Sequence, residues 1–387
     1  MRNDDYYIGT RRAGAFQIFA VAAFLLFGLS IPATAGTPLT FLKKVGTLID
    51  TLSVSGLDRR YIDKPDKPWQ IIVKGNVNQS DLKMNTTNDL LGLKTTFDPR
   101  LKTEPAYYVG VWAGYRGYGL GYTINVAGDK GSYFTLGAMG GAYGINLRIH
   151  TFKNDAPDIE MNSENEELIP SIKDQVKLKD PIKVRTVIAD GYYMFNGKRF
   201  SYAAAYDQSV IQIRSAGSLM AGAMYYYSNT DFATDANGPI IYMMDGLGRV
   251  KLWQASIGVG YAYNWVPVKG LLVSAMAMPM LTFINQIRLY SYTTNFLELA
   301  LDPAGDALEG DEFDKWLYDN SRIEEKEYNT YNGGLAVNFD ARLSLTYNFN
   351  RYFINAYGQF CNFRYRHDES HGNLNDWFVN ASFGVRL

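Results

Sequence analysis

The chain has 387 residues and a formal net charge of −1, so its charge offers no basis for binding nucleic acid. Hydrophobic residues make up 47% and charged residues 20%, which excludes a disordered chain and a membrane protein built from many apolar helices. The 29 tyrosines, 21 phenylalanines and 36 glycines fit many strands and tight turns, in either a membrane barrel or a soluble β-sandwich. The one cysteine, Cys361, excludes an internal disulfide and a multi-cysteine metal site, and we expect it to be a small packing residue.

Residues 1–35 have the features of a secretory signal peptide. Two arginines precede an apolar run from residue 15 to 29. The small residues Ala33, Ala35 and Gly36 then provide a cleavage site. Because the run is too short for a comfortable membrane span, we expect export and cleavage rather than an uncleaved anchor.

Residues 36–68 are expected to lead into the main domain. Apolar residues recur at helical spacing between 39 and 54, which predicts a short amphipathic helix. Such a helix would pack against one end of the domain or partly plug it. Pro65 and Pro68 then end any helix and favour extended chain.

From residue 69 on, the dominant sequence period is two. Between residues 335 and 349 apolar or aromatic residues alternate with polar or small ones, and residues 377–387 repeat the pattern. A strand with one face in lipid and one in a polar lumen requires this alternation, although a soluble sandwich would also alternate. The export signal, the aromatics near strand ends and the charges in mid-strand favour the barrel. No stretch after the signal approaches 18 continuous apolar residues, so a membrane-spanning domain must be a closed barrel.

We therefore predict an all-β fold in which residues 69–387 form an antiparallel transmembrane β-barrel. Thirteen segments have strand character, whereas single-chain bacterial barrels have an even number of strands. Either 132–153 is one long strand or 199–229 pairs differently, so we predict twelve strands, with fourteen as the alternative. The candidate strands are 69–80, 105–114, 117–126, 132–140, 143–153, 183–195, 199–208, 215–229, 250–265, 270–289, 335–348, 352–365 and 376–387. The polar residues expected to face the lumen are Asn146, Arg148, His150, Asp340, Arg342 and Arg386.

Short and long connections alternate along the chain, as expected for an outer-membrane barrel. We expect short turns at 196–197, 266–270 and 348–351 to face the periplasm. The long connections, which include 85–104 and 291–334, would face outward. The second of these carries ten acidic residues between 302 and 327. Their spacing matches no calcium-binding loop, so we interpret them as solvated surface, with cations that bridge lipopolysaccharide as the alternative.

Several short motifs occur in a fixed order in the second half of the chain. Residues 200–208 read FSYAAAYDQ, residues 212–218 read QIRSAGS, and residues 258–265 read GVGYAYNW. With Tyr61, Pro65 and Trp69 before them, these motifs resemble domain of unknown function 4421, a family of exported Bacteroidota-type proteins taken to be outer-membrane barrels. The resemblance extends from about residue 60 to 387, and its central motif includes Gln212, Arg214, Ser215, Gly217 and Ser218. It implies a barrel in the outer membrane of a Gram-negative bacterium and assigns no activity.

Two classes of function remain open. The first is a non-enzymatic barrel: a narrow pore, a small-molecule conduit, or a structural or surface protein, with outer-membrane lipid and the barrel-assembly machinery as partners and no cofactor. The second is an outer-membrane lipid hydrolase, which needs a nucleophile and a base within hydrogen-bond reach. Ser215, Ser218 and His150 are candidates, but no G-x-S-x-G motif accompanies them. The other histidines, His367 and His371, fall in an expected outer loop, so we favour the first class.

Overall fold

The structure is a computed structural model that describes residues 56–90, 93–102, 105–128, 130–156, 158–163, 172–175, 178–244, 246–306, 308–367 and 370–387. The predicted signal peptide with its cleavage site and the predicted helix at 39–54 lie outside these residues. In the described part of the chain, no helix is both long and apolar enough to cross a membrane.

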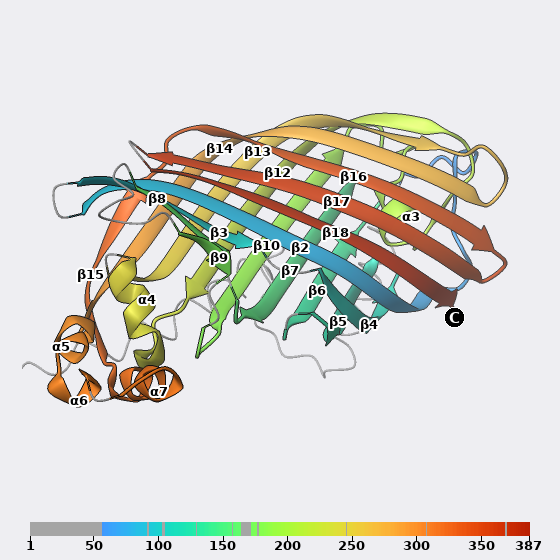
Figure 1. Ribbon diagram of the computed structural model, residues 1–387. Helices are drawn as coiled ribbons and strands as arrows, with labels where there is room; N and C mark the ends of the chain where they lie inside the picture. The colour runs from blue at the N-terminus through green and yellow to red at the C-terminus, as the bar shows by residue number, and fades with distance from the viewer. Residues whose placement is uncertain are drawn as a thin grey trace, which may run out of the picture. The chain divides into compact units, whose positions relative to one another are not determined.

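Within the described residues, twelve antiparallel strands form a closed ring, which confirms the predicted barrel and its strand number (Figure 1). The ring closes where β18 pairs with β2, from Arg386 opposite Gln70 to His371 opposite Asn85. Closure leaves no free edge along the ring, so its backbone groups find partners in neighbouring strands. The twelve strands are β2 (Trp69–Leu90), β4 (Ala106–Tyr115), β5 (Tyr118–Ala127), β6 (Ser132–Met139), β7 (Tyr143–Asn154), β10 (Ile182–Met194), β12 (Ala216–Asp231), β13 (Leu247–Trp265), β14 (Leu271–Thr294), β16 (Ala336–Phe349), β17 (Tyr352–His367) and β18 (Ser370–Arg386).

The strand predicted at 199–208 was wrong, and its removal brings thirteen candidates down to twelve. This segment contains a short helix, α3 (Tyr202–Tyr206), followed by the two-residue strand β11 (Ile211–Gln212). Three consecutive alanines favour a helix, and Ser201 caps it by accepting a hydrogen bond from the Ala204 amide at 3.1 Å. The apparent alternation of residues 199–208 therefore reflects a connection between two strands.

Three segments expected to be loops, 85–104, 153–182 and 291–334, contain strands outside the ring. The far half of β2 pairs with β3 (Leu93–Lys102), which continues through β8 (Asp158–Ser163) to β9 (Ile172–Gln175). The far half of β14 pairs with β15 (Ile323–Asn332). These strands extend hairpins beyond the ring, because long neighbouring strands offer them unpaired backbone groups.

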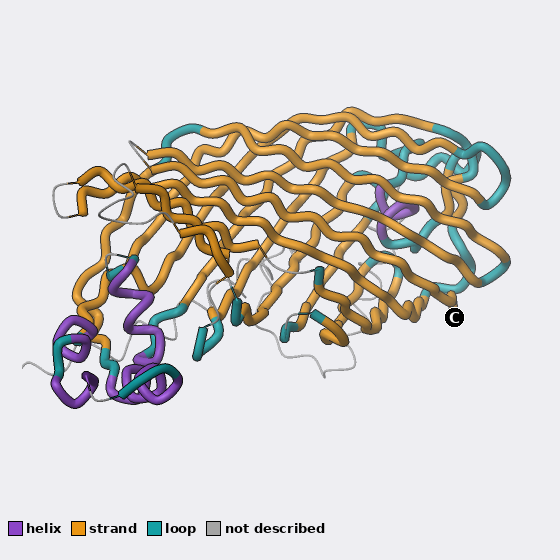
Figure 2. The backbone as a smooth tube through the Cα atoms, in the orientation of Figure 1, coloured by secondary structure: helices purple, strands orange, loops and turns teal. Residues whose placement is uncertain are grey.

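The remaining short helices gather at the end of the ring opposite α3, so the two ends differ (Figure 2). We call the end that holds α3 the plug end and the other the loop end. The loop-end helices are η1 (Asp235–Asn237), α4 (Gly238–Met243), α5 (Phe296–Ala300), α6 (Pro303–Asp306) and α7 (Asp311–Asn320).

Burial along the strands is the reverse of that in a soluble protein. On β16 the polar side chains of Asp340, Arg342 and Ser344 are buried, whereas Leu343 and Leu345 between them are exposed. The polar faces of the strands thus point into the ring and the apolar faces point outward, as a membrane barrel requires.

Candidate functional site in the barrel lumen

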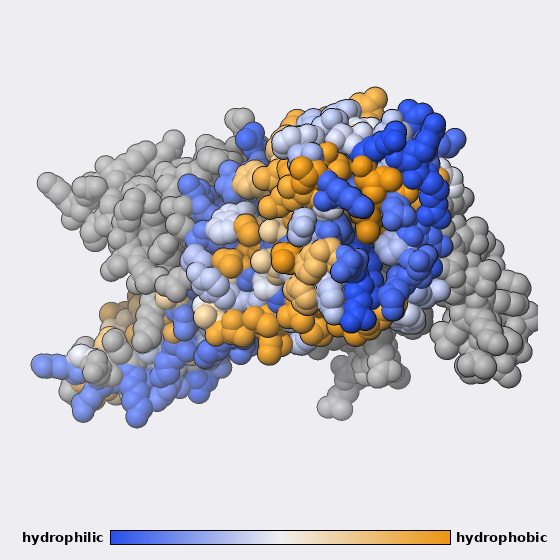
Figure 3. Space-filling view, turned by 90° about the vertical axis from the view of Figure 1, so that its right-hand side faces the viewer, coloured by the Kyte–Doolittle hydropathy of each residue, from blue (hydrophilic) through white to orange (hydrophobic). Residues whose placement is uncertain are grey.

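The connection from residue 195 to 215 folds into one end of the ring and closes it. We call this segment the plug. Its helix α3 lies inside the ring in Figure 1, with its three alanines almost fully buried. Figure 3 looks toward this end, where hydrophobic and hydrophilic side chains lie side by side. The FSYAAAYDQ motif of the sequence therefore forms the core of the plug.

Gln212 ties the two ends of the plug together. Its amide nitrogen donates to the carbonyl oxygens of Arg199 at 2.6 Å and Arg214 at 2.8 Å. Its amide oxygen accepts a hydrogen bond from the Ser201 backbone at 2.9 Å. The side chain of Asn264, on β13, donates to the same oxygen at 3.1 Å. One buried amide thus closes the plug on itself and attaches it to the wall.

The wall of the ring also binds carbonyl groups in the last turn of α3 and just after it. Ser344 and Asn355 both donate to the carbonyl oxygen of Ala205, at 2.7 Å and 3.2 Å. Arg386 donates to the carbonyl oxygen of Gln208, at 2.8 Å from Nη2 and 3.1 Å from Nε. The last carbonyls of a helix lack partners within the helix, so these wall residues satisfy groups that would otherwise be buried alone.

The chain that precedes β2 packs on the plug at the plug end of the ring. Strand β1 (Ile62–Asp63) pairs with β11, and the Asp58 amide donates to the Lys198 carbonyl at 2.8 Å. Hydrogen bonds from Arg60 lower the pKa of Asp58 to about 2, so this carboxylate stays charged throughout the physiological pH range. The docked segment adds a second layer to the closed end.

A buried network of charges joins the plug to two walls of the lumen. Arg342, on β16 and only 6% exposed, lies 3.3 Å from carboxylate oxygens of both Asp190 and Asp340. Its guanidinium also donates to the hydroxyls of Tyr192, on β10, and Tyr202, on α3. A buried cation between two carboxylates is satisfied only while all partners are in place, so the network fixes the position of α3.

Two amides complete this network. Asn146 donates to Asp190 at 2.7 Å, and Gln359 donates to Asp340 at 3.0 Å. The structure thus brings three of the predicted lumen residues, Asn146, Asp340 and Arg342, into one cluster. Arg386 lies apart from it, on β18, where it binds the Gln208 carbonyl of the plug.

Residues of this network that the sequence analysis missed are Asp190, Tyr192, Tyr202 and Gln359. Asp190 and Tyr192 are two positions apart on β10, so the period-two pattern places them on one face and could have identified them. No comparable signal exists for Tyr202, because its helix was taken for a strand.

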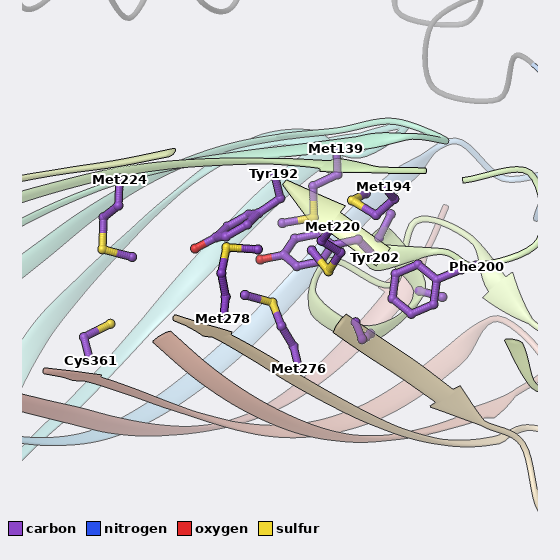
Figure 4. Close-up of a cluster of buried hydrophobic side chains, with 14 of the residues drawn as sticks. Met139, Tyr192, Met194, Phe200, Tyr202, Met220, Met224, Met276, Met278 and Cys361 are labelled. Carbon is purple, nitrogen blue, oxygen red and sulfur yellow. The ribbon is translucent and has the colours of Figure 1, made fainter. Parts of the chain in front are cut away.

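The lumen also holds a methionine-rich cluster, whereas the sequence pattern predicts a polar lumen. Figure 4 shows its members around Tyr192 and Tyr202. Methionine is flexible and fills irregular space, so this cluster packs around α3 and seals the plug on one side. The methionines of the cluster are Met139, Met194, Met220, Met224, Met276, Met278 and Met280.

Beside the plug a cavity of about 70 Å³ remains, with room for several water molecules. Lys74, Arg148 and Asp207 are among its lining residues. The Lys74 ammonium lies 4.4 Å from the ring centre of Trp112, and the Arg148 guanidinium lies 4.5 Å from that of Phe378. Within the described part of the chain, neither cation makes a hydrogen bond or an ion pair. Two charges therefore remain available to water or to a small anion.

The candidate hydrolase residues do not meet. His150 hydrogen-bonds the Tyr108 hydroxyl at 2.9 Å and stacks on Tyr133 with ring centres 3.8 Å apart. In the strand register, Thr186 of β10 lies opposite His150 on one side and opposite residue 228 of β12 on the other. His150 is therefore level with residue 228, which is ten positions along β12 from Ser218. At a rise of about 3.3 Å per residue, roughly 33 Å separate the histidine from that serine.

The remaining candidate side chains have structural partners. Ser215 accepts a hydrogen bond from the Val266 amide at 2.9 Å, and Ser218 accepts one from the Asn196 amide at 2.9 Å. Cys361 is buried and accepts a hydrogen bond from Gln359 at 3.2 Å. Among the described residues, no group of three or more potential ligands is arranged to hold a metal ion.

Comparisons with known proteins give one match by sequence family. The family model described as "Domain of unknown function (DUF4421)" matches residues 56–386. No curated protein matches the sequence.

Solved structures resemble the fold only loosely. The outer membrane protease OmpT from Escherichia coli shares 9% identity at a TM-score of 0.38, covering 84% of this chain and 97% of its own. The β domain of the Bordetella autotransporter BrkA shares 10% identity at a TM-score of 0.31, covering 83% and 100%. An outer membrane channel from Pseudomonas putida F1 shares 10% identity at a TM-score of 0.29, covering 84% and 97%. Likenesses of this size say nothing about activity.

Proposed function

We propose that this chain, which belongs to the DUF4421 family, is a non-enzymatic outer-membrane β-barrel that serves as a closed conduit for small solutes. The plug is the observation that carries the proposal. It closes one end of a lumen whose remaining space is lined by unpaired charges. A barrel of twelve strands is wider than the eight-stranded barrels that side chains alone can fill, so a separate segment is needed to close it.

The outward face supports a place in a membrane. On β13 the exposed side chains of Ile257, Val259 and Tyr261 form an apolar strip. Trp253 and Trp265 bound this strip, and the eleven residues between them, 254–264, match the length of a membrane-spanning strand, about 9–11 residues. Tryptophan favours the two membrane interfaces, so the aromatics mark where the ring would enter and leave the lipid.

The two ends of the ring support an orientation. Apart from the plug, the connections at the plug end are short, whereas four of the six at the loop end are long. In outer-membrane barrels short turns face the periplasm and long loops face outward. The plug would then close the barrel from the periplasmic side, after export and insertion by the barrel-assembly machinery.

The size and the charge of the cavity favour a small solute, and an anion over a cation. Lys74 and Arg148 offer positive charge that no side chain in the described residues neutralises through an ion pair. Four buried polar atoms of the lining residues also lack hydrogen-bond partners in the described residues: Nε1 of Trp112, Oδ1 of Asp190, the hydroxyl of Tyr206 and Oδ2 of Asp207. Buried polar groups normally have partners, so water or a solute is expected at this place.

The membrane location is tested by fractionation and gel mobility of the full chain. We expect the protein to sediment with outer membrane, to resist carbonate extraction and to migrate differently on gels with and without boiling, because a closed barrel stays folded in the gel detergent until it is boiled. In planar bilayers the refolded protein should show little or no steady conductance, since the plug closes the lumen. Recovery in a soluble fraction with heat-independent mobility would refute the barrel in a membrane, and a large steady conductance would refute the closed state.

A charge placed on the outward face should prevent assembly. Leu343 is 60% exposed and lies on the outward face of β16. Leu343→Arg should destabilise the inserted barrel, because an arginine on the lipid face costs about 2–4 kcal/mol at mid-bilayer and less toward an interface, whereas the control Leu343→Phe should assemble normally. Heat-dependent gel mobility and the urea midpoint of unfolding measure the effect. Equal stability of the two variants would place this face outside the lipid.

A further inference from the structure

Six basic side chains cluster on the outward face of the ring at its loop end, and they are not part of the lumen. We call them the basic patch. Its members are Lys153 of β7, Lys183 and Arg185 of β10, Arg249 and Lys251 of β13, and Arg288 of β14. The patch thus crosses five neighbouring strands, from β7 through β10, β12 and β13 to β14.

The strand register brings these cations together. Lys183 lies opposite Lys153, and Lys251 lies opposite Arg288. Arg185 and Lys251 pair with the same residue of β12 from its two sides. Neighbouring strands are about 4.8 Å apart, so these head groups can reach a common ligand.

Aromatic rings already hold three of the cations in place. The Lys251 ammonium donates to the Tyr290 hydroxyl at 2.8 Å, and the Arg249 guanidinium lies 5.3 Å from the same ring centre. The Arg288 guanidinium lies 5.2 Å from the ring of Trp253 and 4.7 Å from that of Tyr328. Long side chains held in this way lose little further freedom on binding a ligand.

The charge of the patch is only partly neutralised. Arg249 pairs with Asp231 at 2.9 Å and with Glu325 at 3.8 Å. Among the residues that the structure describes, the other five cations form no ion pair. Six cations minus two carboxylates leave a local charge of +4. Such a surface fits an anionic ligand with several oxygens, and arginine binds phosphate with particular specificity.

The place of the patch favours a lipid as the source of that anion. Val187 and Trp253 lie two residues closer to the plug end than Arg185 and Lys251, on the same face of their strands. Both pair with Tyr227 of β12, so the rings of Tyr227 and Trp253 lie next to the patch at the expected membrane interface. The basic patch therefore begins where the aromatic belt ends, at the depth of lipid headgroups.

We propose that the basic patch binds the phosphate groups of a phosphorylated lipid in the outer leaflet. The inference rests on the proposed membrane location and orientation. The lipid tails lie along the apolar strip below the aromatics, while the headgroup phosphates contact the cations of β10, β13 and β14. Binding in this way would orient the barrel at a fixed depth.

Native mass spectrometry of the refolded full chain in detergent tests the proposal, with bisphosphorylated lipid A and its dephosphorylated form as probes. We expect the phosphorylated form to bind at least about tenfold more tightly. The double variant Lys251→Gln with Arg288→Gln should remove most of this difference, since each basic residue near a lipid surface contributes about 1 kcal/mol, roughly a fivefold change. A matched control, Lys198→Gln with Lys269→Gln, removes two exposed cations at the plug end and should bind like the unmodified chain.

Three results would overturn the proposal. They are equal binding of the two lipid forms, equal loss in both double variants, and displacement of the lipid by inorganic phosphate at equal concentration, which would indicate a site for free phosphate. If the same preparations keep their heat-dependent mobility, these results leave the proposed barrel function standing. Loss of heat-dependent mobility in the unmodified chain would overturn both.

Discussion

Removal of the plug is expected to turn a closed barrel into a conducting one. Phe195 and Asn196 hydrogen-bond to Leu219 and Ser218, so the β10–β12 hairpin can be closed just beyond them. Replacing residues 197–217 by Asn-Gly, which favours a two-residue hairpin turn, should keep the ring and empty its plug end. We expect single-channel conductance in planar bilayers to rise by on the order of tenfold or more over the unmodified chain, because a twelve-stranded ring is wider than its wall side chains alone can fill.

Single substitutions in the plug should have smaller effects on conductance than its deletion. Gln212→Ala removes the amide that ties the plug to itself and to β13, so brief openings should appear. Lys198→Ala, an exposed change in the same segment, should stay closed. A plug-deleted barrel that keeps its heat-dependent mobility and still does not conduct would refute the conduit, because wall side chains would then close the lumen.

The opened lumen should prefer anions. Near the cavity and the plug, deletion of Asp207 leaves four cations, Lys74, Arg148, Arg342 and Arg386, against the two carboxylates Asp190 and Asp340. Charges of one sign in a low-dielectric channel concentrate counter-ions. In the plug-deleted background, Lys74→Gln with Arg148→Gln should therefore shift the reversal potential toward cation selectivity. An unchanged potential would show that these two residues do not face the ion path.

The second large effect is expected at the centre of the lumen. Arg342→Met should lower the free energy of unfolding by about 3–5 kcal/mol, because it leaves Asp190 and Asp340 as uncompensated buried charges. The triple variant that also carries Asp190→Asn and Asp340→Asn removes those charges and should regain much of the loss. Urea unfolding of the barrel in detergent, followed by gel mobility, measures both.

A matched control lies one residue away. Leu343→Met changes the outward neighbour of Arg342 and should shift the urea midpoint little, since it keeps the volume and the apolar character. If Arg342→Met proved as stable as this control, the lumen would have to be hydrated enough to solvate both carboxylates. In that case the network would not be what positions α3.

The wall of the barrel could be predicted from the sequence. Alternation from residue 335 to 349 places Arg342 and Leu343 on opposite faces, and the structure buries the first and exposes the second. This works because side chains alternate strictly along a strand, so a period of two assigns faces without knowledge of the neighbours. The expected fold and all but one of the candidate strands follow from that rule.

The contents of the lumen could not be predicted in this way. The FSYAAAYDQ segment alternates in hydrophobicity like a strand, yet it becomes α3 because the ring offers it buried partners such as Ser344 and Asn355. Likewise Asp190 and Arg342 are 152 positions apart in the chain and meet only across the closed lumen. Local sequence carries no information on which side chains face each other across that space.

The sequence by itself thus determined the strand faces, the strand number once one candidate was removed, and the family, because each depends on local period or on motif order. The tertiary structure alone decided that one connection folds inward, that Arg342 joins the plug to two walls, and that Lys74 and Arg148 stay unpaired beside the cavity. It also gathered six cations from four strands into one patch. Ring closure is the physical reason, since it fixes distances between strands that the chain leaves far apart.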